Sequence, residues 1–533
     1  MTIIKLFIEK RMIIIKGVLS TKMKKNQINT IINIVTIKIF TATKKVYFIV
    51  FLLLLMSFDS IAQSNKQKLP PNFLFVMVDD QAYDALGFYD RYPFLETPNM
   101  DRLAREGANF RNFFVTQSLC SPSRASFLTG TYPHVHGATQ NKGQLDPNWK
   151  KYPSYTSILQ QQGYETAMVG KIHMAHYRGK KHVRPGFDYW FSFIGQGKYF
   201  DPMVNENGKD YREKGYMTDI LTNKAIQWLK EKRNVNKPFN LCLWHKAIHG
   251  PHSPAPRHSN IYKKEDIPKP PFNTHEENFS GKPEWQRIKA SSSKQEKYQP
   301  VDSLPRKNWP IREEKTKKML ETLIAVDESL GKVLETLEEI GELENTVVVF
   351  TSDNGYFMGE HTYSDKRIAY EPSMRIPMLI RYPKMIKPGI EIKEMCLNID
   401  MAPTFLDLSN SNIPSYMQGE SMVPLLKENK EVAWRDAAMF EYYVDDKYPD
   451  AGPNMLAVRT ERYKLVDNFL KDDIDELYDL KKDPGEMNNL INDSEFDDVE
   501  KNLRNKLEKL RDKYKYNVDR DWWLRQVVNQ SPK

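Results

Sequence analysis

Short apolar runs alternate with helical patterns along the middle of the chain, and this alternation constrains the fold more than any other feature. The runs Phe73 to Val78 and Phe239 to Trp244 have the length and composition of buried strands. Between Met319 and Ile340, apolar residues recur every three or four positions, as they do along a helix that packs on a sheet. The pattern predicts an α/β domain with a large, mostly parallel central sheet flanked by helices.

Further elements follow from the same patterns. A helix is expected at Thr156 to Gln162, and strands are expected at Tyr164 to Val169, Thr346 to Phe350 and Pro377 to Arg381. After Lys430 the pattern changes: Leu456 to Val466 and the later run DELYDL predict a small antiparallel sheet, followed by a terminal helix at Asp497 to Tyr514. We therefore predict a catalytic domain at residues 63–430 and a smaller C-terminal subdomain at residues 431–533.

The basic charge of the chain is concentrated at its beginning. Of a formal net charge of +9, residues 1–62 contribute ten Lys and Arg against two acids, so the remainder is nearly neutral and nucleic-acid binding is not expected. The apolar run Val46 to Met56 behind two lysines suits a signal peptide, with cleavage after Ala62. We expect an exported protein, periplasmic or secreted, with no stable membrane insertion after cleavage; an uncleaved membrane anchor is the alternative.

One of the three cysteines lies in an unusual setting. Cys120 opens the pentad Cys-Ser-Pro-Ser-Arg at the start of an apparent helix, where helix amides and the guanidinium of Arg124 can hold an anion beside a nucleophile. The alternative is a buried thiol in an ordinary loop. Cys242 and Cys396 lie in apolar runs that indicate core positions, so the fold does not depend on a disulfide framework.

Two of the predicted strands end in acidic residues. Asp79 and Asp80 follow the first strand, and Asp353 and Asn354 follow the strand that begins at Thr346. Because the carboxyl ends of parallel strands gather at one edge of a sheet, these side chains can converge. Crowded carboxylates need a cation, and such oxygen ligands suit calcium or magnesium rather than zinc. Taken singly, either pair is more often a turn or a helix cap.

Cationic side chains follow other strands. Lys171 and His173 come after the strand that ends at Val169, and His249 follows the strand that ends at Trp244. Lys366 lies a short distance beyond the second acidic pair. Each of these residues alone is more often solvated or part of the core. Together with the acids they predict an anion-handling site.

The stretch from Cys120 to Gly130, CSPSRASFLTG, resembles the signature of type I, formylglycine-dependent sulfatases of the alkaline phosphatase superfamily. The likeness runs from Asn72 to about Leu480. It implies that a maturation enzyme converts Cys120 to formylglycine (3-oxoalanine), and that the hydrated aldehyde attacks the sulfur of the substrate.

The resemblance also implies roles for the residues at the strand ends. The implied calcium ligands are Asp79, Asp80, Cys120, Asp353 and Asn354. The implied catalytic set is Cys120, Arg124, Lys171, His173, His249 and Lys366. His249 is preceded by Ile248 where the family usually has proline, which leaves His245 and His252 as substitutes.

The resemblance implies hydrolysis of sulfate esters in a sulfated polysaccharide or its oligosaccharides. The leader looks like those of polysaccharide-degrading bacteria, so an algal glycan such as ulvan or carrageenan is favoured as the substrate. A sulfatase that acts on glucosamine in glycosaminoglycans is the alternative. A phosphonate or phosphate diester hydrolase of the same superfamily and a catalytically silent glycan-binding protein are further alternatives. The polar segment Pro254 to Pro310 is either disordered or a functional loop over the site.

Overall fold

The computed structural model describes residues 70–141, 146–174, 186–268, 281–283, 285–286, 310–363, 365–427, 432–444, 452–468 and 474–518. Internal contacts divide the chain into Met1–Leu69 and Pro70–Lys533, and the described residues all belong to the second unit. The predicted leader and its cleavage site lie outside the described residues. Among the helices that the structure describes, none is both long and apolar enough to cross a membrane.

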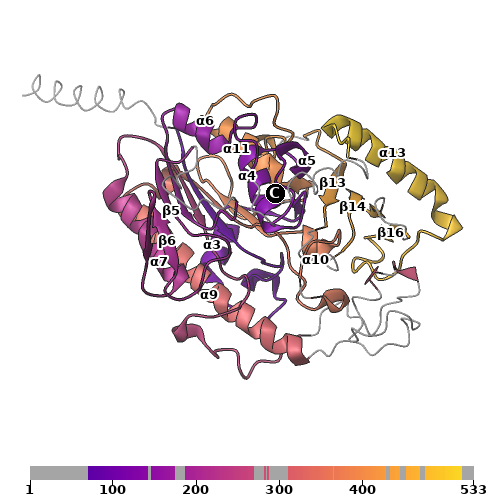
Figure 1. The fold of residues 1–533 in the computed structure, drawn as a ribbon, viewed down its shortest axis with the longest axis horizontal. Helices are drawn as coiled ribbons and strands as arrows, with labels where there is room; N and C mark the ends of the chain where they lie inside the picture. Colours follow the sequence, from indigo (N-terminus) through magenta and orange to yellow (C-terminus); the bar gives the residue numbers. More distant parts are fainter. Residues whose placement is uncertain are drawn as a thin grey trace, which may run out of the picture. The chain divides into compact units, whose positions relative to one another are not determined.

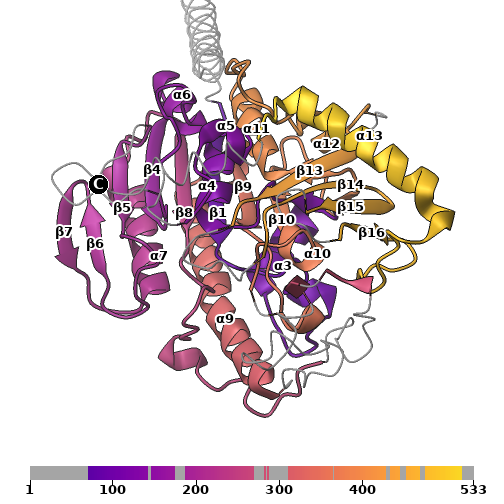
Figure 2. The same ribbon diagram turned by 45° about the vertical axis from the view of Figure 1, so that its right-hand side comes forward.

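A ten-stranded mixed sheet forms the centre of this unit (Figure 2). In order across the sheet, the strands are β11 (Ile390–Ile392), β2 (Ala108–Phe110), β10 (Met378–Arg381), β9 (Thr346–Ser352), β1 (Asn72–Val78), β8 (Phe239–Trp244), β4 (Glu165–Gly170), β5 (Tyr189–Ser192), β6 (Met203–Glu206) and β7 (Lys209–Arg212). The neighbours from β9 to β5 pair in parallel, whereas β10, β6 and β7 pair antiparallel with their neighbours. The predicted mostly parallel α/β sheet is confirmed.

Helices cover both faces of the sheet because its central strand is apolar on both sides. The alternate residues Leu74 and Val76 of β1 face one core, whereas Phe73 and Phe75 face the other. The first core contains α3 (Pro98–Glu106), α7 (Met217–Gln227) and α9 (Pro310–Glu339). The second contains α4 (Cys120–Thr129), α6 (Tyr155–Gln161) and α11 (Met401–Leu408). In that core the ring of Phe405 packs edge-on against Phe73, with centroids 5.0 Å apart.

A smaller antiparallel sheet follows near the end of the chain (Figure 1). Its strands are β13 (Ala437–Tyr442), β14 (Met455–Thr460), β15 (Tyr463–Asp467) and β16 (Glu476–Asp479). The terminal helix α13 (Asp497–Tyr514) buries Leu503 and Leu507 in the core of this sheet. Both elements agree with the prediction. The boundary between residues 430 and 431 stays a prediction, since the same apolar cluster also includes the earlier residues Phe357 and Tyr370.

The remaining α-helices and β-strands of the described residues are short. They are β3 (Phe113–Phe114), β12 (Cys396–Leu397), α5 (Pro133–His136), α10 (Glu371–Met374) and α12 (Val423–Leu426). The helix predicted from Met319 begins earlier, at Pro310, where proline suits the first helical position. Its first turns were not predicted because they are polar and show no apolar period. Of the polar segment Pro254 to Pro310, residues 269–280, 284 and 287–309 lie outside the described residues, so its two interpretations stay open.

One buried ion pair joins the start of α11 to the segment that enters β13. Arg435 donates to both carboxylate oxygens of Asp400, one of them at 2.7 Å, and the two side chains are 4% and 0% exposed. Asp400 also accepts the backbone N–H of Leu397 at 2.7 Å. Removing the guanidinium would leave a buried carboxylate without its cation, which is the costly way to break such a pair.

We therefore expect Arg435→Met to lower the free energy of unfolding by about 3–5 kcal/mol. The control is Lys513→Met, which removes an exposed partner of Glu420 (51% and 40% exposed). That loss should be at most about 1 kcal/mol. Urea denaturation followed by circular dichroism measures both variants, and equal losses would contradict the structural role given to Arg435.

Candidate active site

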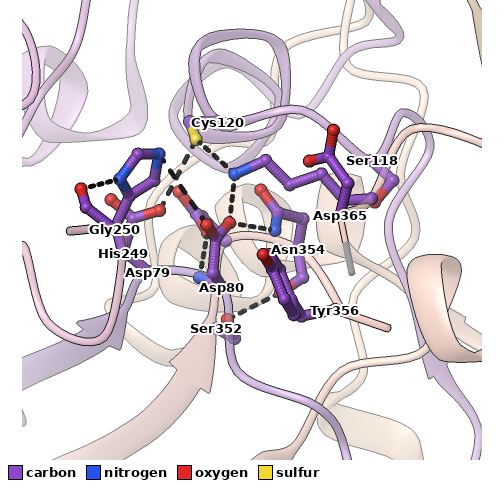
Figure 3. Close-up of polar contacts among 12 residues, drawn as sticks. Asp79, Asp80, Ser118, Cys120, His249, Gly250, Ser352, Asn354, Tyr356 and Asp365 are labelled. Carbon is purple, nitrogen blue, oxygen red and sulfur yellow. Dashed lines mark hydrogen bonds and ion pairs between the residues drawn. The ribbon is translucent and has the colours of Figure 1, made fainter. Parts of the chain in front are cut away.

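The predicted site residues meet at the carboxyl ends of four adjacent strands, β9, β1, β8 and β4. Figure 3 shows Asp79, Asp80, Cys120, His249 and Asn354 gathered there. The backbone ladder continues past the strand ends and holds the loops in register. The N–H of Asp79 donates to the carbonyl of Ala247 at 2.8 Å, and that of Asp353 donates to the carbonyl of Val78 at 3.0 Å. The two acidic pairs, far apart in the sequence, therefore lie side by side as predicted.

Three carboxylates and one thiol form a compact cluster. One ligand atom from each of Asp79, Asp80, Cys120 and Asp353 lies within 4.8 Å of every other, and none of the four residues is more than 3% exposed. Asn354 donates from Nδ2 to Asp80 Oδ1 at 2.7 Å. Its Oδ1 is buried and has no hydrogen-bond partner among the described residues. Hard oxygen donors that converge in this way fit a divalent cation such as calcium.

The charges in the cluster are balanced by neighbouring cations. Burial acts to raise the pKa of Asp79, but Lys171 and the other nearby cations hold it well below its usual range. Burial also acts to raise the pKa of Asp80, but the charge of Lys366 outweighs it, so this pKa is lowered as well. Burial and the charge of Asp79 instead raise the pKa of Asp353 to about 6. Asp353 therefore still experiences repulsion from Asp79, and a divalent ion bound among the carboxylates would relieve it.

Cys120 is the first residue of α4 and is fully buried. Its Sγ accepts from Lys366 Nζ at 3.2 Å and lies 3.5 Å from Asp79 Oδ1. Burial and the charge of Asp79 raise the pKa of the thiol to about 12. An unmodified thiol at this position would therefore remain protonated at neutral pH and would be a weak nucleophile.

Arg124 and Lys171 connect the nucleophile position to the acids. Arg124 donates from Nε to Asp353 Oδ2 at 2.9 Å and from Nη1 to the carbonyl of Lys171 at 2.6 Å. Its Nη2 lies 3.8 Å from Asp79 and has no hydrogen-bond partner among the described residues. Lys171 Nζ donates to Asp79 and to the side-chain oxygen of Gln196. Both cations are fully buried, so the electrostatic field that they exert in the site is weakly screened.

The other predicted residues complete the same site. Lys366 Nζ pairs with Asp80, and His249 Nε2 lies 3.7 Å from Asp80 Oδ2. His173 is 5% exposed, and its Nδ1 has no hydrogen-bond partner within the described part of the chain. Burial lowers the pKa of His249 to about 4 and that of His173 well below its usual value, so both imidazoles are neutral in the structure.

The two histidines considered as substitutes for His249 face elsewhere. His245 Nε2 lies 3.3 Å from Ser329 Oγ on α9, and His252 Nδ1 donates to the carbonyl of Ile248 at 2.7 Å. Only His249 shares the cluster with Asp79 and Cys120 among the described histidines.

Two polar neighbours of the site, Gln196 and Lys246, were not predicted from the sequence. Gly195 and Gly197 flank Gln196 with φ of 61° and 63°, so the run Gly-Gln-Gly was the available signal for a tight turn there. Lys246 lies three residues before His249, and its position shortly after the strand that ends at Trp244 was the available signal.

The geometry of this site agrees with the comparison to known families. The family model described as Sulfatase matches residues 71–411, and the model described as N-sulphoglucosamine sulphohydrolase, C-terminal, matches residues 359–513. The chain belongs to the sulfatase family. The predictions of the family and of a sulfuric ester hydrolase are thereby confirmed. Sulfatases of this family generally use formylglycine and a divalent metal ion, and the cluster around Cys120 can hold both.

Similar proteins cover most of the chain. It is 36% identical to the N-acetylglucosamine-6-O-sulfatase of Bacteroides thetaiotaomicron, over 87% of this chain and 90% of that protein. It is 28% identical to the ulvan-active sulfatase of Formosa agariphila, over 91% of this chain and 90% of that protein. A solved structure of a protein in complex with its substrate D-glucosamine-2-N,6-O-disulfate has a TM-score of 0.75, with 35% identity, and covers 84% of this chain and 99% of that one.

Metal binding can be tested through stability as well as activity. After chelation, added calcium should raise the melting temperature, because a ligand at about 100 times its Kd stabilises the folded state by about 2.7 kcal/mol. Asp353→Asn should abolish the rise and the turnover. The control is Asp327→Asn, which changes a buried aspartate that caps α3 away from the cluster and should leave the rise intact. An unchanged melting temperature in the unsubstituted protein would contradict a metal site.

Proposed function

We propose that this sulfatase hydrolyses the 6-O-sulfate ester of glucosamine residues in a sulfated carbohydrate, using formylglycine at position 120 and a bound calcium ion. The observation that carries the reaction is the buried cluster of three carboxylates, Cys120 and three cations at one edge of the sheet. The sugar is inferred from the relative that is 36% identical and from the 35% identical protein whose solved structure holds a glucosamine disulfate.

Different site residues supply the nucleophile, the metal ligands and the cations that bind a sulfate ester. When present, the hydrated aldehyde at position 120 supplies a hydroxyl nucleophile, and calcium held by Asp79, Asp80, Asp353 and Asn354 supplies positive charge. Lys171, Lys366 and Arg124 are buried cations that can neutralise the sulfate oxygens and the charge that grows on them during transfer. The bond between Arg124 and Asp353 fixes the guanidinium, so little reorganisation is needed when the ester binds.

Proton transfer falls to the two histidines. The leaving oxygen of a sugar is strongly basic, so a proton donated to it speeds cleavage, typically by about 10²–10⁴-fold. We assign that donor to His249, with Lys366 assisting. An anionic ester among these residues adds negative charge near the imidazole and raises its pKa towards the range in which it can donate. His173, neutral and with a free Nδ1 among the described residues, is assigned as the base that helps to expel sulfate.

A cavity whose lining includes Ala82, two residues beyond Asp80, is the proposed place for the sugars next to the sulfated one. It has a volume of about 570 Å³ and is lined by the loop that follows Asp80, by α10, and by the turns of the C-terminal sheet. Arg375 and Lys481 line it, and among the described residues neither forms an ion pair with a carboxylate. The volume lies within the usual range for ligand pockets of about 300–1,000 Å³. We therefore propose an oligosaccharide or polymer as the substrate.

A sulfated algal glycan is the second candidate, which sequence analysis favoured. The ulvan-active relative supports it, since the match covers 91% of this chain, although the identity is lower at 28%. Either substrate fits an exported enzyme. We propose export through the leader, followed by a periplasmic or secreted location, and conversion of Cys120 by a formylglycine-generating maturation enzyme.

Modification of Cys120 has a direct mass signature. Peptide mass spectrometry of active protein should show a loss of about 18 Da at Cys120, because a carbonyl oxygen replaces the thiol and one hydrogen. The modified fraction should rise when the maturation enzyme is co-expressed, and specific activity should rise in proportion. Cys242 and Cys396 are internal controls that should retain their thiols. Full activity in protein with unmodified Cys120 would contradict the proposed nucleophile.

Substrate preference can be decided by measuring sulfate release from a defined panel. We expect D-glucosamine-2-N,6-O-disulfate and longer 6-O-sulfated glucosamine oligosaccharides to exceed ulvan oligosaccharides in kcat/KM by roughly 10–200-fold, the range that pocket contacts usually provide. The reverse order would select the algal candidate. A phosphonate or phosphate diester that is cleaved faster than every sulfate ester would overturn the proposed function.

A further inference from the structure

The turn that carries His249 is held by side chains along three successive carbonyls. The bonds are His252 Nδ1 to the Ile248 carbonyl at 2.7 Å, Tyr199 Oη to the His249 carbonyl at 2.7 Å, and Lys246 Nζ to the Gly250 carbonyl at 3.3 Å. The Gly250 carbonyl also accepts from Nδ1 of His249 itself, at 2.8 Å (Figure 3). The backbone of this turn and the imidazole ring are therefore fixed by the same set of donors.

Tyr199 and Lys246 form one unit within this set. The ammonium of Lys246 lies 4.5 Å from the centroid of the Tyr199 ring, a cation–π distance. The two residues are 4% and 1% exposed. Burial raises the pKa of Tyr199 well above its usual value, so its hydroxyl stays protonated and remains a donor. Among the described carboxylates, none lies within ion-pair distance of Lys246, so its hydrogen bond to the turn is not part of a salt bridge.

The direction of the His249 ring depends on this unit. Because Nδ1–H is committed to the Gly250 carbonyl, Nε2 is the nitrogen that faces Asp80, at 3.7 Å, and the reacting groups. A shift of the 249 or 250 carbonyl would rotate or translate the imidazole. Proton transfer needs donor and acceptor within about 2.6–3.2 Å of each other, so a small displacement is enough to weaken it.

We propose that Tyr199 and Lys246 are positioning residues that hold His249 in the orientation needed to protonate the leaving group. The proposal rests on the role of His249 in the proposed function. Neither the family resemblance nor the pattern of residues at the strand ends assigns Tyr199 or Lys246 a role in the reaction.

The chain offers a matched control for Tyr199. Tyr216 stacks on Tyr199, with centroids 5.9 Å apart and an interplanar angle of 17°. Its hydroxyl donates to the carbonyl of Ser253 at 3.0 Å, four residues beyond His249. Tyr199→Phe and Tyr216→Phe each remove one phenol-to-carbonyl hydrogen bond from the same segment, but only the first of these bonds holds the turn that orients the histidine.

The experiment compares two aryl sulfates, 4-nitrophenyl sulfate with a good leaving group and phenyl sulfate with a poor one, so it does not depend on the sugar. A misplaced proton donor should matter only for the poor leaving group. We expect Tyr199→Phe to lose about 10-fold in kcat on phenyl sulfate and less than about 2-fold on 4-nitrophenyl sulfate, with KM little changed. Lys246→Met should show the same dependence, and Tyr216→Phe should lose less than about 2-fold on both esters.

His249→Ala provides the reference. If it loses about 10²–10⁴-fold on phenyl sulfate and much less on 4-nitrophenyl sulfate, His249 is the proton donor. Equal losses on both esters in His249→Ala would refute that role and with it the positioning proposal. If His249→Ala shows the dependence while Tyr199→Phe and Lys246→Met lose equally on both esters, or lose nothing, the proposed function stands and the positioning proposal is wrong. Melting temperatures of all four variants identify any variant that fails to fold.

Discussion

The repulsion among three buried carboxylates is the constraint on which the rest of the site depends. Asp79, Asp80 and Asp353 lie within ion-pair distance of Lys171, Lys366 and Arg124, and all six side chains are nearly inaccessible to water. Burying so many charges is unfavourable unless each is paired. The cations therefore serve stability and chemistry together, since the groups that allow the acids to be buried are those that can bind a sulfate. Substitution of any one of them should change both properties.

The sheet explains how such a costly arrangement is maintained. β1 is paired in parallel on both sides, with β8 and β9, and both of its faces are covered by apolar cores. Its register with β9 runs without a break from Asn72 opposite Thr346 to Val78 opposite Ser352. The acids come immediately after that ladder, so the burial of apolar strand residues supplies the free energy that holds the charged loops together. The positions of these acids follow from strand register rather than from affinity among the loops.

The burial of the strands also determines what could be predicted from the sequence. Buried central strands are continuous apolar runs, so the positions of β1, β8 and β9 were predicted to within two residues of each end. The acids at their tips were found because they follow those runs directly. By contrast, β6 and β7 lie at the edge of the sheet, with exposed residues such as Met203 and Lys209, and have no comparable period.

The donors that surround the site were harder to predict for a different reason. Tyr199 and Gln196 lie in an irregular loop after β5 and reach the site through side chains, so no spacing relates them to Lys171 or His249. Their partners are a backbone carbonyl and an ammonium, and neither leaves a sequence pattern. Contacts of this kind depend on how one loop packs over another. For that reason the convergence of the strand-end acids could be predicted from the chain, whereas the side chains that donate to neighbouring loops required the structure.

Three residues in or beside the site adopt a backbone conformation that is rare outside glycine. Asp80, His173 and Arg367 adopt φ of 67°, 57° and 94°, a region of backbone conformation that residues other than glycine rarely occupy. Each lies within the site or next to one of its residues, and each is held by neighbours. The N–H of Asp80 donates to Asp353 Oδ1 at 3.2 Å, the carbonyl of His173 accepts from Ser121, and Arg367 pairs with Asp365. The strain is tolerated because the surrounding contacts fix the loops. A glycine at position 80 would relieve the strain but would remove the carboxylate. The strained conformation of Asp80 is therefore the cost of placing a charge at this position.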